Sequence, residues 1–251
     1  MIRPDRRLVL LGAPALLAGC DQAAQSEAAR CTVKKAESVT RWVQRRTISR
    51  NALAPEYKPS DISPDFRANG STDPADAEYR RLRAGAFRDY RLAVDGLVER
   101  PLALSLDQLR ALPSRTQITK HDCVEGWTSI GKWRGARLSA VLNAAALKPE
   151  AKYIVFHCFD APDQREDGDR YYTSVDLVDA FHEQSILAYE MNDQPLPVKH
   201  GAPIRVRLER QLGYKMAKYI KRIEAVESFA HIGGGHGGYW EDRGYEWYAG
   251  I

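Results

Sequence analysis

The pattern of apolar and polar residues predicts strands along most of the second half of the chain. Residues 153–159 form a short, mostly apolar run, which is typical of a buried strand. Leu92 and Val94 alternate with polar neighbours, which predicts a half-buried strand. Residues 97–104 predict a second strand that returns beside it, although Pro101 interrupts it.

Further strands are expected at residues 116–122, 186–190, 204–208 and 219–228. Helices are fewer and short. Ser105 and Gln108 match a capping box for a helix that ends before Pro113, residues 138–147 carry helical periodicity, and residues 176–181 predict one further turn. Because strands outnumber helices without long β-α alternation, we expect an α+β fold with a mixed β-sheet.

The first third of the chain carries little apolar periodicity. We expect residues 20–55 to be a tether and a loosely held arm, in which Arg41, Arg45, Arg46 and Arg50 could line one face of a short helix. Residues 55–70 are a loop by composition. The folded domain is therefore expected at residues 56–230, followed by a tail rich in glycine and aromatic residues at 231–251.

The N-terminus has the pattern of an export signal over residues 1–19. Its apolar run, residues 8–18, is shorter than the roughly 20 residues that a membrane-spanning helix needs. Leu17-Ala18-Gly19-Cys20 resembles a bacterial lipobox, which implies cleavage before Cys20 and its lipidation. Arg6-Arg7 resembles a twin-arginine signal for export of folded proteins. With Asp21 as an inner-membrane retention signal, these features imply a periplasmic protein anchored to the inner membrane.

The charge and the cysteines narrow the range of functions. The formal net charge is +4 over 251 residues, and the first 19 residues supply +2 of it. The remainder is too weakly basic to indicate a nucleic-acid partner. The four cysteines, Cys20, Cys31, Cys123 and Cys158, match no CxxC zinc or redox spacing.

Residues 120–127, Lys-His-Asp-Cys-Val-Glu-Gly-Trp, are the strongest candidate for chemistry. Cys123 follows a predicted strand among polar neighbours, and a thiolate both binds metals and attacks electrophiles. We expect the loop after this strand to carry Trp127 and Trp133, two rings able to exclude water. The alternative is that Cys123 is a small buried hydrophobe.

Two later stretches combine basic side chains with small residues. They are residues 200–205, His-Gly-Ala-Pro-Ile-Arg, and residues 213–218, Gly-Tyr-Lys-Met-Ala-Lys. Glycine permits a close approach of the backbone, Arg205 offers a planar set of donors, and Lys218 offers a point charge. Such a set suits a phosphate, although basic residues beside glycine are also common on ordinary surfaces.

The order of these motifs resembles the molybdopterin-binding domain of the sulfite oxidase superfamily. The resemblance runs from Cys-Val-Glu-Gly-Trp through Phe-His-Cys-Phe and Leu-Ala-Tyr-Glu-Met-Asn to the two basic stretches, from about residue 90 to 228. Within the superfamily the chain is most similar to catalytic subunits of the periplasmic methionine-sulfoxide reductases. The family fold, a mixed-sheet domain with short helices, is thereby expected.

The resemblance implies a role for each matching residue. Cys123 would bind molybdenum directly, and Glu125 matches an acidic residue near the metal. The residues implied to contact the molybdopterin are Phe66, Arg67, Ala68, Asn69, Cys158, His200, Arg205, Met216, Ala217 and Lys218. Cys158 and His200 depart from the Thr and Asn that relatives often have, which leaves their hydrogen bonds open.

The implied activity is two-electron oxygen-atom transfer to or from a small molecule. Reduction is favoured, since the sulfite-oxidising branch typically carries a different cysteine motif. Electrons would come from a membrane cytochrome b or a quinol-linked donor, and we expect a monomeric catalytic subunit. Sulfite oxidation remains the alternative direction. Two other classes are a cofactor-free thiol enzyme that uses Cys123 with His121 and a lipoprotein that binds an anion without redox chemistry.

The tail at residues 231–251 is expected either to fold onto the domain or to act as a lid or docking surface. Five glycines precede Tyr239, Trp240, Tyr245, Trp247 and Tyr248. His231 and His236 are weak candidates for a metal pair because no further ligands accompany them.

Overall fold

The computed structural model describes residues 27–251, and its contacts divide the chain into two compact units, Met1–Ile48 and Ser49–Ile251. The export signal, Arg6-Arg7, Cys20 and Asp21 lie outside the described residues. The predictions made for them stay predictions.

The described part of the first unit forms helix α2 (Glu27–Thr47). The sequence predicted a short helix here, and the helix that forms is longer, with 21 residues, while the prediction of a tether and loosely held arm stays a prediction. The segment is rich in Ala, Glu, Lys, Arg and Gln, which have high helix propensity. Arg45 and Arg46 in the last turn add a favourable interaction with the helix dipole. Of the helices described, none is both long and apolar enough to cross a bilayer.

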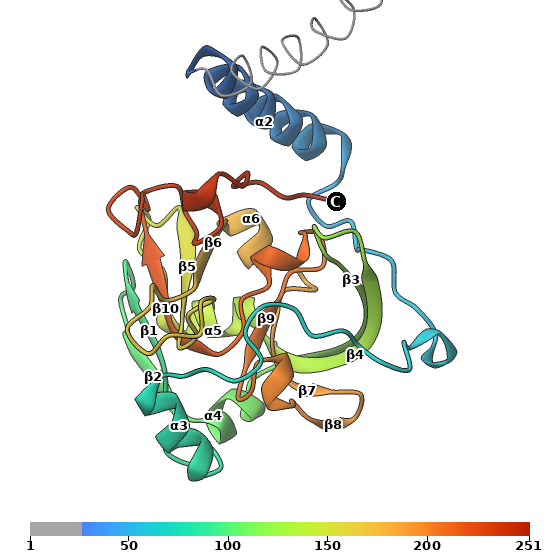
Figure 1. The fold of residues 1–251 in the computed structure, drawn as a ribbon, viewed down its shortest axis with the longest axis vertical. Coiled ribbons are helices and arrows are strands. Elements are labelled where there is room, and N and C mark those ends of the chain that lie inside the picture. The colour runs from blue at the N-terminus through green and yellow to red at the C-terminus, as the bar shows by residue number, and fades with distance from the viewer. Residues whose placement is uncertain (1–26) are drawn as a thin grey trace, which may run out of the picture. The chain divides into compact units, whose positions relative to one another are not determined.

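In the second unit, one five-stranded sheet has the order β2-β1-β10-β5-β6 (Figure 1). Its strands are β1 (Leu92–Gly96), β2 (Leu102–Leu104), β5 (Tyr153–Cys158), β6 (Tyr172–Asp176) and β10 (Ile220–Val226). β1 pairs with β10 in parallel, with Val94 opposite Ile223, and the other pairs are antiparallel. The sheet is therefore mixed, as the sequence predicted.

The other sheet has the order β3-β4-β7-β8, with β9 paired to β7. These strands are β3 (Ser114–Asp122), β4 (Thr128–Arg137), β7 (Ile186–Met191), β8 (Gln194–Pro195) and β9 (Arg205–Arg207). β3 and β4 form a long antiparallel hairpin in which Asp122 lies opposite Thr128. A register shift between Arg134 and Gly135 interrupts the pairing of β4 with β7. In Figure 1 this sheet lies on the right of the unit and the first sheet on the left.

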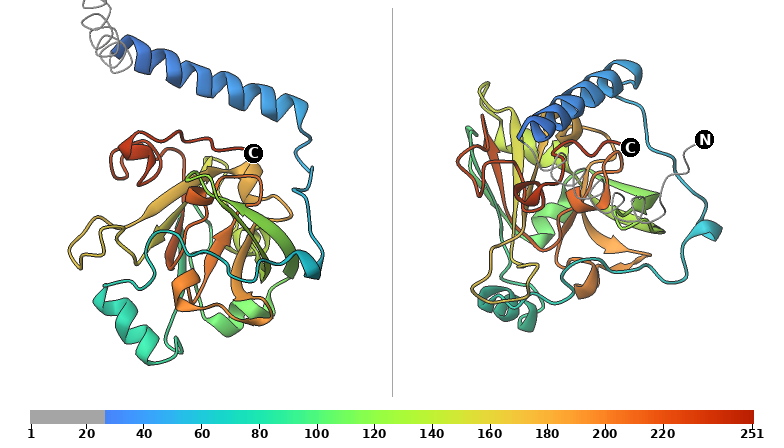
Figure 2. Two further views of the ribbon diagram at one scale, coloured as in Figure 1. Left: turned by 45° about the vertical axis from the view of Figure 1, so that its right-hand side comes forward. Right: turned by 45° about the horizontal axis from the view of Figure 1, so that its top comes forward.

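Short helices connect and cover the sheets (Figures 1 and 2). The α-helices are α3 (Ala77–Ala84), α4 (Leu106–Ala111), α5 (Leu138–Ala145) and α6 (Leu177–Ala180). The 3-10 turns are η1 (Pro59–Asp61), η2 (Val198–His200), η3 (Gly213–Lys215) and η4 (Glu241–Arg243). α5 buries Leu138, Val141, Leu142 and Ala145, the face that its periodicity predicted. The class is α+β, in agreement with the sequence.

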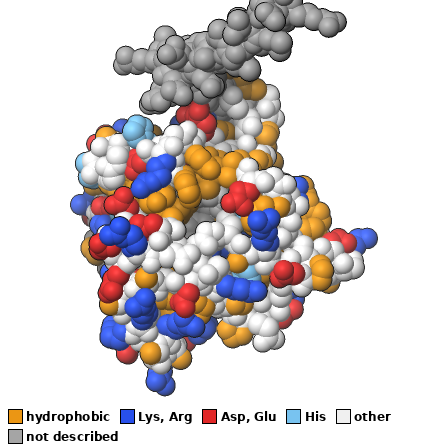
Figure 3. Space-filling model, in the orientation of Figure 1, with side chains coloured by type: hydrophobic (Ala, Val, Ile, Leu, Met, Phe, Trp, Pro, Cys, Tyr) orange, Lys and Arg blue, Asp and Glu red, His pale blue; other side chains and the backbone are white. Residues whose placement is uncertain are grey.

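Two groups of buried apolar side chains stabilise the unit. The larger group packs α3, α4 and α5 against the first sheet and includes Tyr79, Leu109, Leu142 and Phe156. The smaller group is Phe66, Trp133, Ile186, Ala188, Met191 and Leu196. On the face shown in Figure 3, hydrophobic side chains gather around a hollow in the upper part of the unit, while charged side chains are scattered below it.

Several predicted elements differ from the structure. Residues 128–133 were expected to continue a loop, but they belong to β4, and Trp133 is buried in the smaller core group rather than lining a site. Residues 97–101 are not a strand. The Leu97 N–H donates to the carbonyl of Ala225 and the Val98 N–H to that of Gly96, and pairing with β1 begins only after Pro101. The helix α3 and the strands β6 and β8 were not predicted at all.

Candidate functional site

Cys123 lies in the tight turn that joins β3 to β4. Its backbone N–H donates to the carbonyl of Trp127 at 2.9 Å, and the Gly126 N–H donates back to the Cys123 carbonyl at 3.0 Å. Gly126 has a φ of +85°, which other residues rarely adopt. The turn therefore presents the Cys123 thiol at the end of a rigid hairpin, as the sequence predicted for its position.

A cavity of about 150 Å³ opens beside this thiol. Five of the predicted site residues line it: Asn69, Cys123, Glu125, Met216 and Lys218. The lining also includes Val124, Gly213 and Tyr214 from the candidate stretches, Trp240 and Tyr245 from the tail, and four residues that the sequence did not indicate: Gly70, Asp160, Pro162 and Tyr171. Segments far apart in the chain, from residue 69 to residue 245, thus meet at one place.

Arg205 lies beside the cavity lining and is completely buried. Its guanidinium donates to the carbonyls of His200 and Met216, each at 3.2 Å, while its Nε–H has no partner. Burial, reinforced by the nearby Arg207, lowers the pKa of Arg205 to about 9. A buried cation with an unused donor is energetically costly unless an anion binds to it.

Lys218 ties the same region to the N-terminal loop. Its ammonium donates to the backbone carbonyls of Asn69 and Ser71, more than 140 residues earlier in the chain. Burial and then Arg205 lower the pKa of Lys218 to about 7, while Asp160 opposes that shift. Burial raises the pKa of Asp160 to about 6. Asp160 interacts with Lys218, and Glu209 pairs with Arg207, which leaves Arg205 without a paired carboxylate of its own and positive charge in excess here.

The ring of Trp133 lies beneath two buried guanidiniums. Arg207 and Arg205 lie 4.5 and 5.2 Å from the ring centroid, which are favourable cation–π distances. Arg207 also forms a fully buried ion pair with Glu209 at 2.7 Å. Trp133 therefore supports the basic residues from below and does not wall off the site, contrary to the prediction.

His121 is a neutral, buried neighbour of the site. Burial and then Arg207 lower its pKa well below the usual value, and Arg207 Nη1 lies 3.0 Å from its Nδ1. This contact assigns the proton to Nε2, which has no partner. Gly213 lies against that atom, since a Cβ there would come within 2.4 Å of it. Among the described contacts no hydrogen bond joins His121 to Cys123, which disfavours a thiol enzyme built on this pair.

The Cys123 thiol itself is protonated at neutral pH. Burial is the largest influence on its pKa and raises it. A metal cation would reverse this effect, since coordination removes the thiol proton. The thiol therefore suits metal binding better than unaided nucleophilic attack.

Glu125 lies at the solvent side of the cavity. Its carboxylate accepts a hydrogen bond from Trp127 Nε1 at 2.9 Å and lies 3.9 Å from Arg67 Nη2. The Arg67 guanidinium in turn lies 5.2 Å from the Trp127 ring. These contacts join the predicted loop of residues 66–69 to the cysteine turn.

The other predicted residues surround the cavity without lining it. Phe66 packs edge-on against Trp133 and His200, with centroids 5.2 and 5.5 Å apart. Cys158 is buried at the end of β5, and burial raises its pKa well above the usual value. Ala217 accepts a hydrogen bond from the Val206 N–H at 2.9 Å. Ala68 is half-buried in the loop that begins at Phe66.

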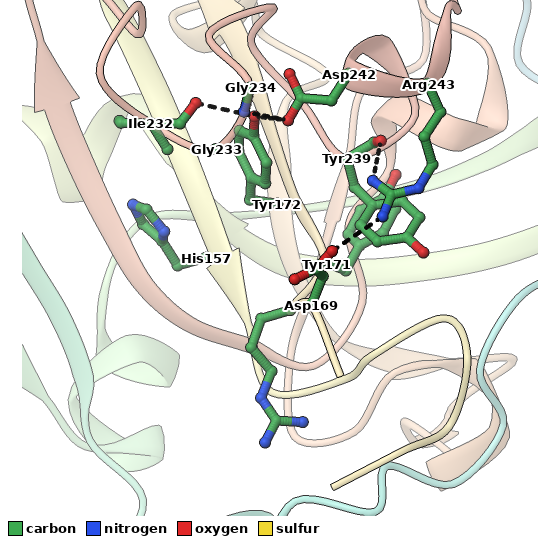
Figure 4. A pocket seen from close by; sticks show the side chains of 11 residues that line it. His157, Asp169, Tyr171, Tyr172, Ile232, Gly233, Gly234, Tyr239, Asp242 and Arg243 are labelled. Atoms are coloured by element: carbon green, nitrogen blue, oxygen red, sulfur yellow. Dashed lines mark hydrogen bonds and ion pairs between the residues drawn. The ribbon is translucent and has the colours of Figure 1, made fainter. Parts of the chain in front are cut away.

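A second cavity has a volume of about 680 Å³ (Figure 4). Its lining comes from β5, the loop before β6, β6 and the tail: His157, Asp169, Arg170, Tyr171, Tyr172, Ile232, Gly233, Gly234, Tyr239, Asp242 and Arg243. Tyr171 lines both cavities. The tail thus forms part of the wall of each of them.

The predicted histidine metal pair finds no support in the described part of the chain. No group of three or more His, Cys, Asp or Glu side chains is arranged there to hold a metal ion. His236 instead contacts Asp242, with Nδ1 3.3 Å from the carboxylate.

The residues present fit a soft-metal cofactor that carries a phosphate. The site offers one thiol, an excess of buried positive charge, and buried donors without partners on Arg205 and His121. Sulfur ligands suit soft metals, and Arg with Lys suits a phosphate. Asn69 was expected here from the family resemblance, whereas no motif placed Trp240, which comes from an irregular segment of the tail.

A family model described as the oxidoreductase molybdopterin binding domain matches residues 81–231. A provisionally named protein-methionine-sulfoxide reductase subunit, YedZ1 of Azospira oryzae, is 37% identical over 98% of this chain and 86% of its own length. The protein-methionine-sulfoxide reductase catalytic subunit MsrP of Xanthomonas axonopodis is 30% identical over 90% of this chain and 70% of its own length. The oxidoreductase YuiH of Bacillus subtilis is 32% identical over 62% of this chain and 72% of its own length.

One solved structure is similar in fold. The sulfane dehydrogenase SoxCD of Paracoccus pantotrophus aligns with a TM-score of 0.50 and 24% identity, covering 56% of this chain and 39% of that one. At this identity the similarity concerns the fold.

Proposed function

This chain belongs to the oxidoreductase molybdopterin-binding domain family, and from this premise we propose that it reduces S-oxides by oxygen-atom transfer at a molybdenum bound through Cys123. It is a molybdopterin-dependent oxidoreductase by family. The observation that carries the finer proposal is the placement of the Cys123 thiol on one cavity with Met216 and Lys218.

Cys123 is the proposed metal ligand. Its thiol lies on a rigid hairpin turn, so little ordering of the chain is needed when a metal binds. The raised pKa of the thiol means that binding releases a proton and becomes tighter as the pH rises.

Arg205 and Lys218 are the proposed contacts to the phosphate and the pterin. Arg205 has an unused buried donor, and Lys218 can exchange its backbone carbonyl partners for an anion. Met216 and Ala217 would offer backbone groups, and Asn69 would close the cofactor site from the N-terminal loop. When bound, the cofactor supplies two-electron oxygen-atom transfer between the substrate and the metal.

Glu125 is the proposed proton carrier. Reduction of an S-oxide to a thioether consumes two electrons and two protons and releases one water molecule. A carboxylate on the cavity, held by Trp127 and open to solvent, can pass these protons inward.

The direction of the reaction rests on the relatives. Two of them carry the name protein-methionine-sulfoxide reductase, and both are called subunits. We therefore infer a separate electron donor, which we propose to be a membrane cytochrome b or a quinol-linked protein. Lipidation of Cys20 in the periplasm after twin-arginine export would keep the enzyme beside such a donor.

The test compares Cys123→Ser with Cys31→Ser in the exported, cofactor-loaded protein. We expect wild type and Cys31→Ser to contain stoichiometric molybdenum and to reduce S-oxides with a dye donor. Cys123→Ser should lose at least about 100-fold in kcat/KM. X-ray absorption at the molybdenum edge should report one fewer sulfur ligand in Cys123→Ser.

Two outcomes would contradict the proposal. Unchanged sulfur coordination in Cys123→Ser would remove the ligand assignment. A wild-type enzyme that oxidises sulfite with dye acceptors but reduces no member of a panel of S-oxides and N-oxides would reverse the direction.

A further inference from the structure

The C-terminal tail supplies one side of the cavity that holds Cys123. Trp240 and Tyr245 both line this cavity, and their rings stack with centroids 5.3 Å apart and planes inclined by 26°. Tyr245 also meets Tyr214 edge-on at 5.2 Å. Both tail residues follow the range that the family model matches, which ends at residue 231. The wall they form therefore lies outside the part of the chain that the family model matches.

The tail is fixed to the domain on both sides of Trp240. The next residue, Glu241, forms an ion pair with Lys215 in which both side chains are only 1% exposed. On the other side, the N–H of Tyr239 donates to the carbonyl of Tyr172 on β6 at 2.9 Å. A buried, paired charge beside the ring holds η4 in one place, so Trp240 has a defined position.

Asp242 and Arg243 fasten the tail beside the second cavity (Figure 4). The Asp242 carboxylate accepts hydrogen bonds from the hydroxyl of Tyr172 and from the N–H of Gly234, the latter at 2.8 Å. Arg243 donates to the carbonyl of Tyr239 at 3.0 Å and to Asp169 at 3.1 Å. Anchors to β6 and to the loop before it thus hold the stacked pair rigidly.

The lining of the cavity combines charged and aromatic side chains. Lys218 and Asp160 contribute charge, and Cys123 contributes the proposed metal ligand. Trp240 and Tyr245 contribute uncharged aromatic rings to the same cavity, and Tyr245 is 39% exposed. Aromatic faces bind thioether and alkyl groups favourably.

We propose that Trp240 and Tyr245 are specificity-determining residues that bind the organic groups on the sulfur of an S-oxide substrate. This inference rests on the proposed function and adds to it the part of the chain that selects the substrate. The stacked pair favours S-oxides with extended alkyl arms, as in oxidised methionine, over dimethyl sulfoxide, which is too small to cover both rings.

The test uses the cofactor-loaded enzyme and the variants Trp240→Ala, Tyr245→Ala and Trp240→Phe. Trp247→Phe is the matched control, because this tail aromatic stacks on Phe229 and does not line the Cys123 cavity. Calorimetry measures the Kd of methionine sulfone, which the enzyme cannot reduce by the proposed reaction. Steady-state kinetics compares methionine sulfoxide with dimethyl sulfoxide.

We expect each alanine variant to bind the sulfone about tenfold more weakly, and Trp240→Phe to lie between these variants and wild type. The KM for methionine sulfoxide should rise by a similar factor while the kinetics with dimethyl sulfoxide change little. Trp247→Phe should match wild type in both measurements. If Trp240→Ala does not fold, Tyr245→Ala and Trp240→Phe still test the proposal. Tyr245 is at the surface, and Trp240→Phe keeps an aromatic ring, so both variants should fold.

The outcomes separate this inference from the proposed function. Unchanged sulfone binding in Tyr245→Ala and Trp240→Phe would overturn the role of Trp240 and Tyr245 in substrate selection. So would an equal rise in KM for methionine sulfoxide and dimethyl sulfoxide. In both cases S-oxide reduction would stand. A wild-type enzyme that binds the sulfone through these rings but reduces no S-oxide would overturn the proposed reaction and leave the binding wall in place.

Discussion

His200 gives the protein a pH-dependent stability that can be measured directly. The side chain is 4% exposed, and burial followed by Arg205 and Lys199 lowers its pKa to about 4. Between pH 6.5 and pH 4 the unfolded chain takes up a proton at this residue and the folded chain does not. Stability is therefore lost as the pH falls through this window.

In protein purified without its cofactor, the free energy of unfolding of wild type should fall between pH 7 and pH 4 by up to about 3 kcal/mol more than that of His200→Asn. Urea unfolding at a series of pH values from 4 to 7.5 measures it as the difference between the two proteins. The difference should vanish above pH 7, where His200 is neutral in both states. Parallel profiles for wild type and His200→Asn across the window would contradict the assignment.

The sequence predicted the residues of the site that belong to motifs and missed those that depend on long-range packing. Cys123, Met216 and Lys218 were found because each lies in a short recognisable stretch. Tyr171 was missed because it directly precedes β6, a strand that carries polar and apolar residues in no regular alternation and is buried throughout. Trp240 gave only a compositional signal, because nothing local indicates that η4 folds back onto the cysteine turn.

At the scale of the elements, Gly135 lies where the backbone of β4 packs closely against β7. It lies at the register shift, and a Cβ there would come within 2.2 Å of the Leu187 carbonyl oxygen. The neighbouring atoms are backbone and cannot move aside without breaking the pairing of these strands.

We expect Gly135→Ala to lower the free energy of unfolding by about 2 kcal/mol or more. Gly85→Ala is the matched control, because a Cβ at the end of α3 meets nothing closer than 3.6 Å and its φ is negative. That variant should be neutral or more stable by up to about 1 kcal/mol. Equal chemical-denaturation midpoints for the two variants would contradict this account of the bulge.

Elements with a strong local signal were predicted well, and those that depend on their partners were not. The capping box of α4 forms as expected: the Gln108 N–H donates to the Ser105 hydroxyl at 3.2 Å, and the Ser105 N–H donates to the Gln108 side chain at 2.8 Å. β4 was mistaken for a loop in its first half because Gly131 and Gly135 weaken the strand pattern. A Cβ at Gly131 would lie 3.2 Å from the Phe66 and Trp133 side chains, which is a tight contact.

For the whole molecule, the division into two compact units predicts that the second is sufficient for folding and catalysis. Both core groups and both cavities lie within residues 49–251. A cofactor-loaded chain that begins at Ser49 should keep dye-linked S-oxide reduction and a Tm within about 3 °C of the full chain.

A chain that ends at residue 230 is the contrasting case. It lacks Glu241 and leaves the buried Lys215 ammonium without its partner. We expect it to lose about 3 kcal/mol or more of stability, which differential scanning calorimetry would report as a lower Tm. Equal losses in both truncated chains would argue against the proposed independence of the second unit.

The parallel pairing of β1 with β10 also sets when the site can form during folding. It joins residues 93–96 to residues 222–225, and the contact of Lys218 with Asn69 closes an even longer loop. Contacts between such distant parts of a chain are slow to form and accumulate late. We therefore expect hydrogen exchange during refolding to protect the β3–β4 hairpin first, and the anion-binding residues to become ordered only in the final kinetic phase.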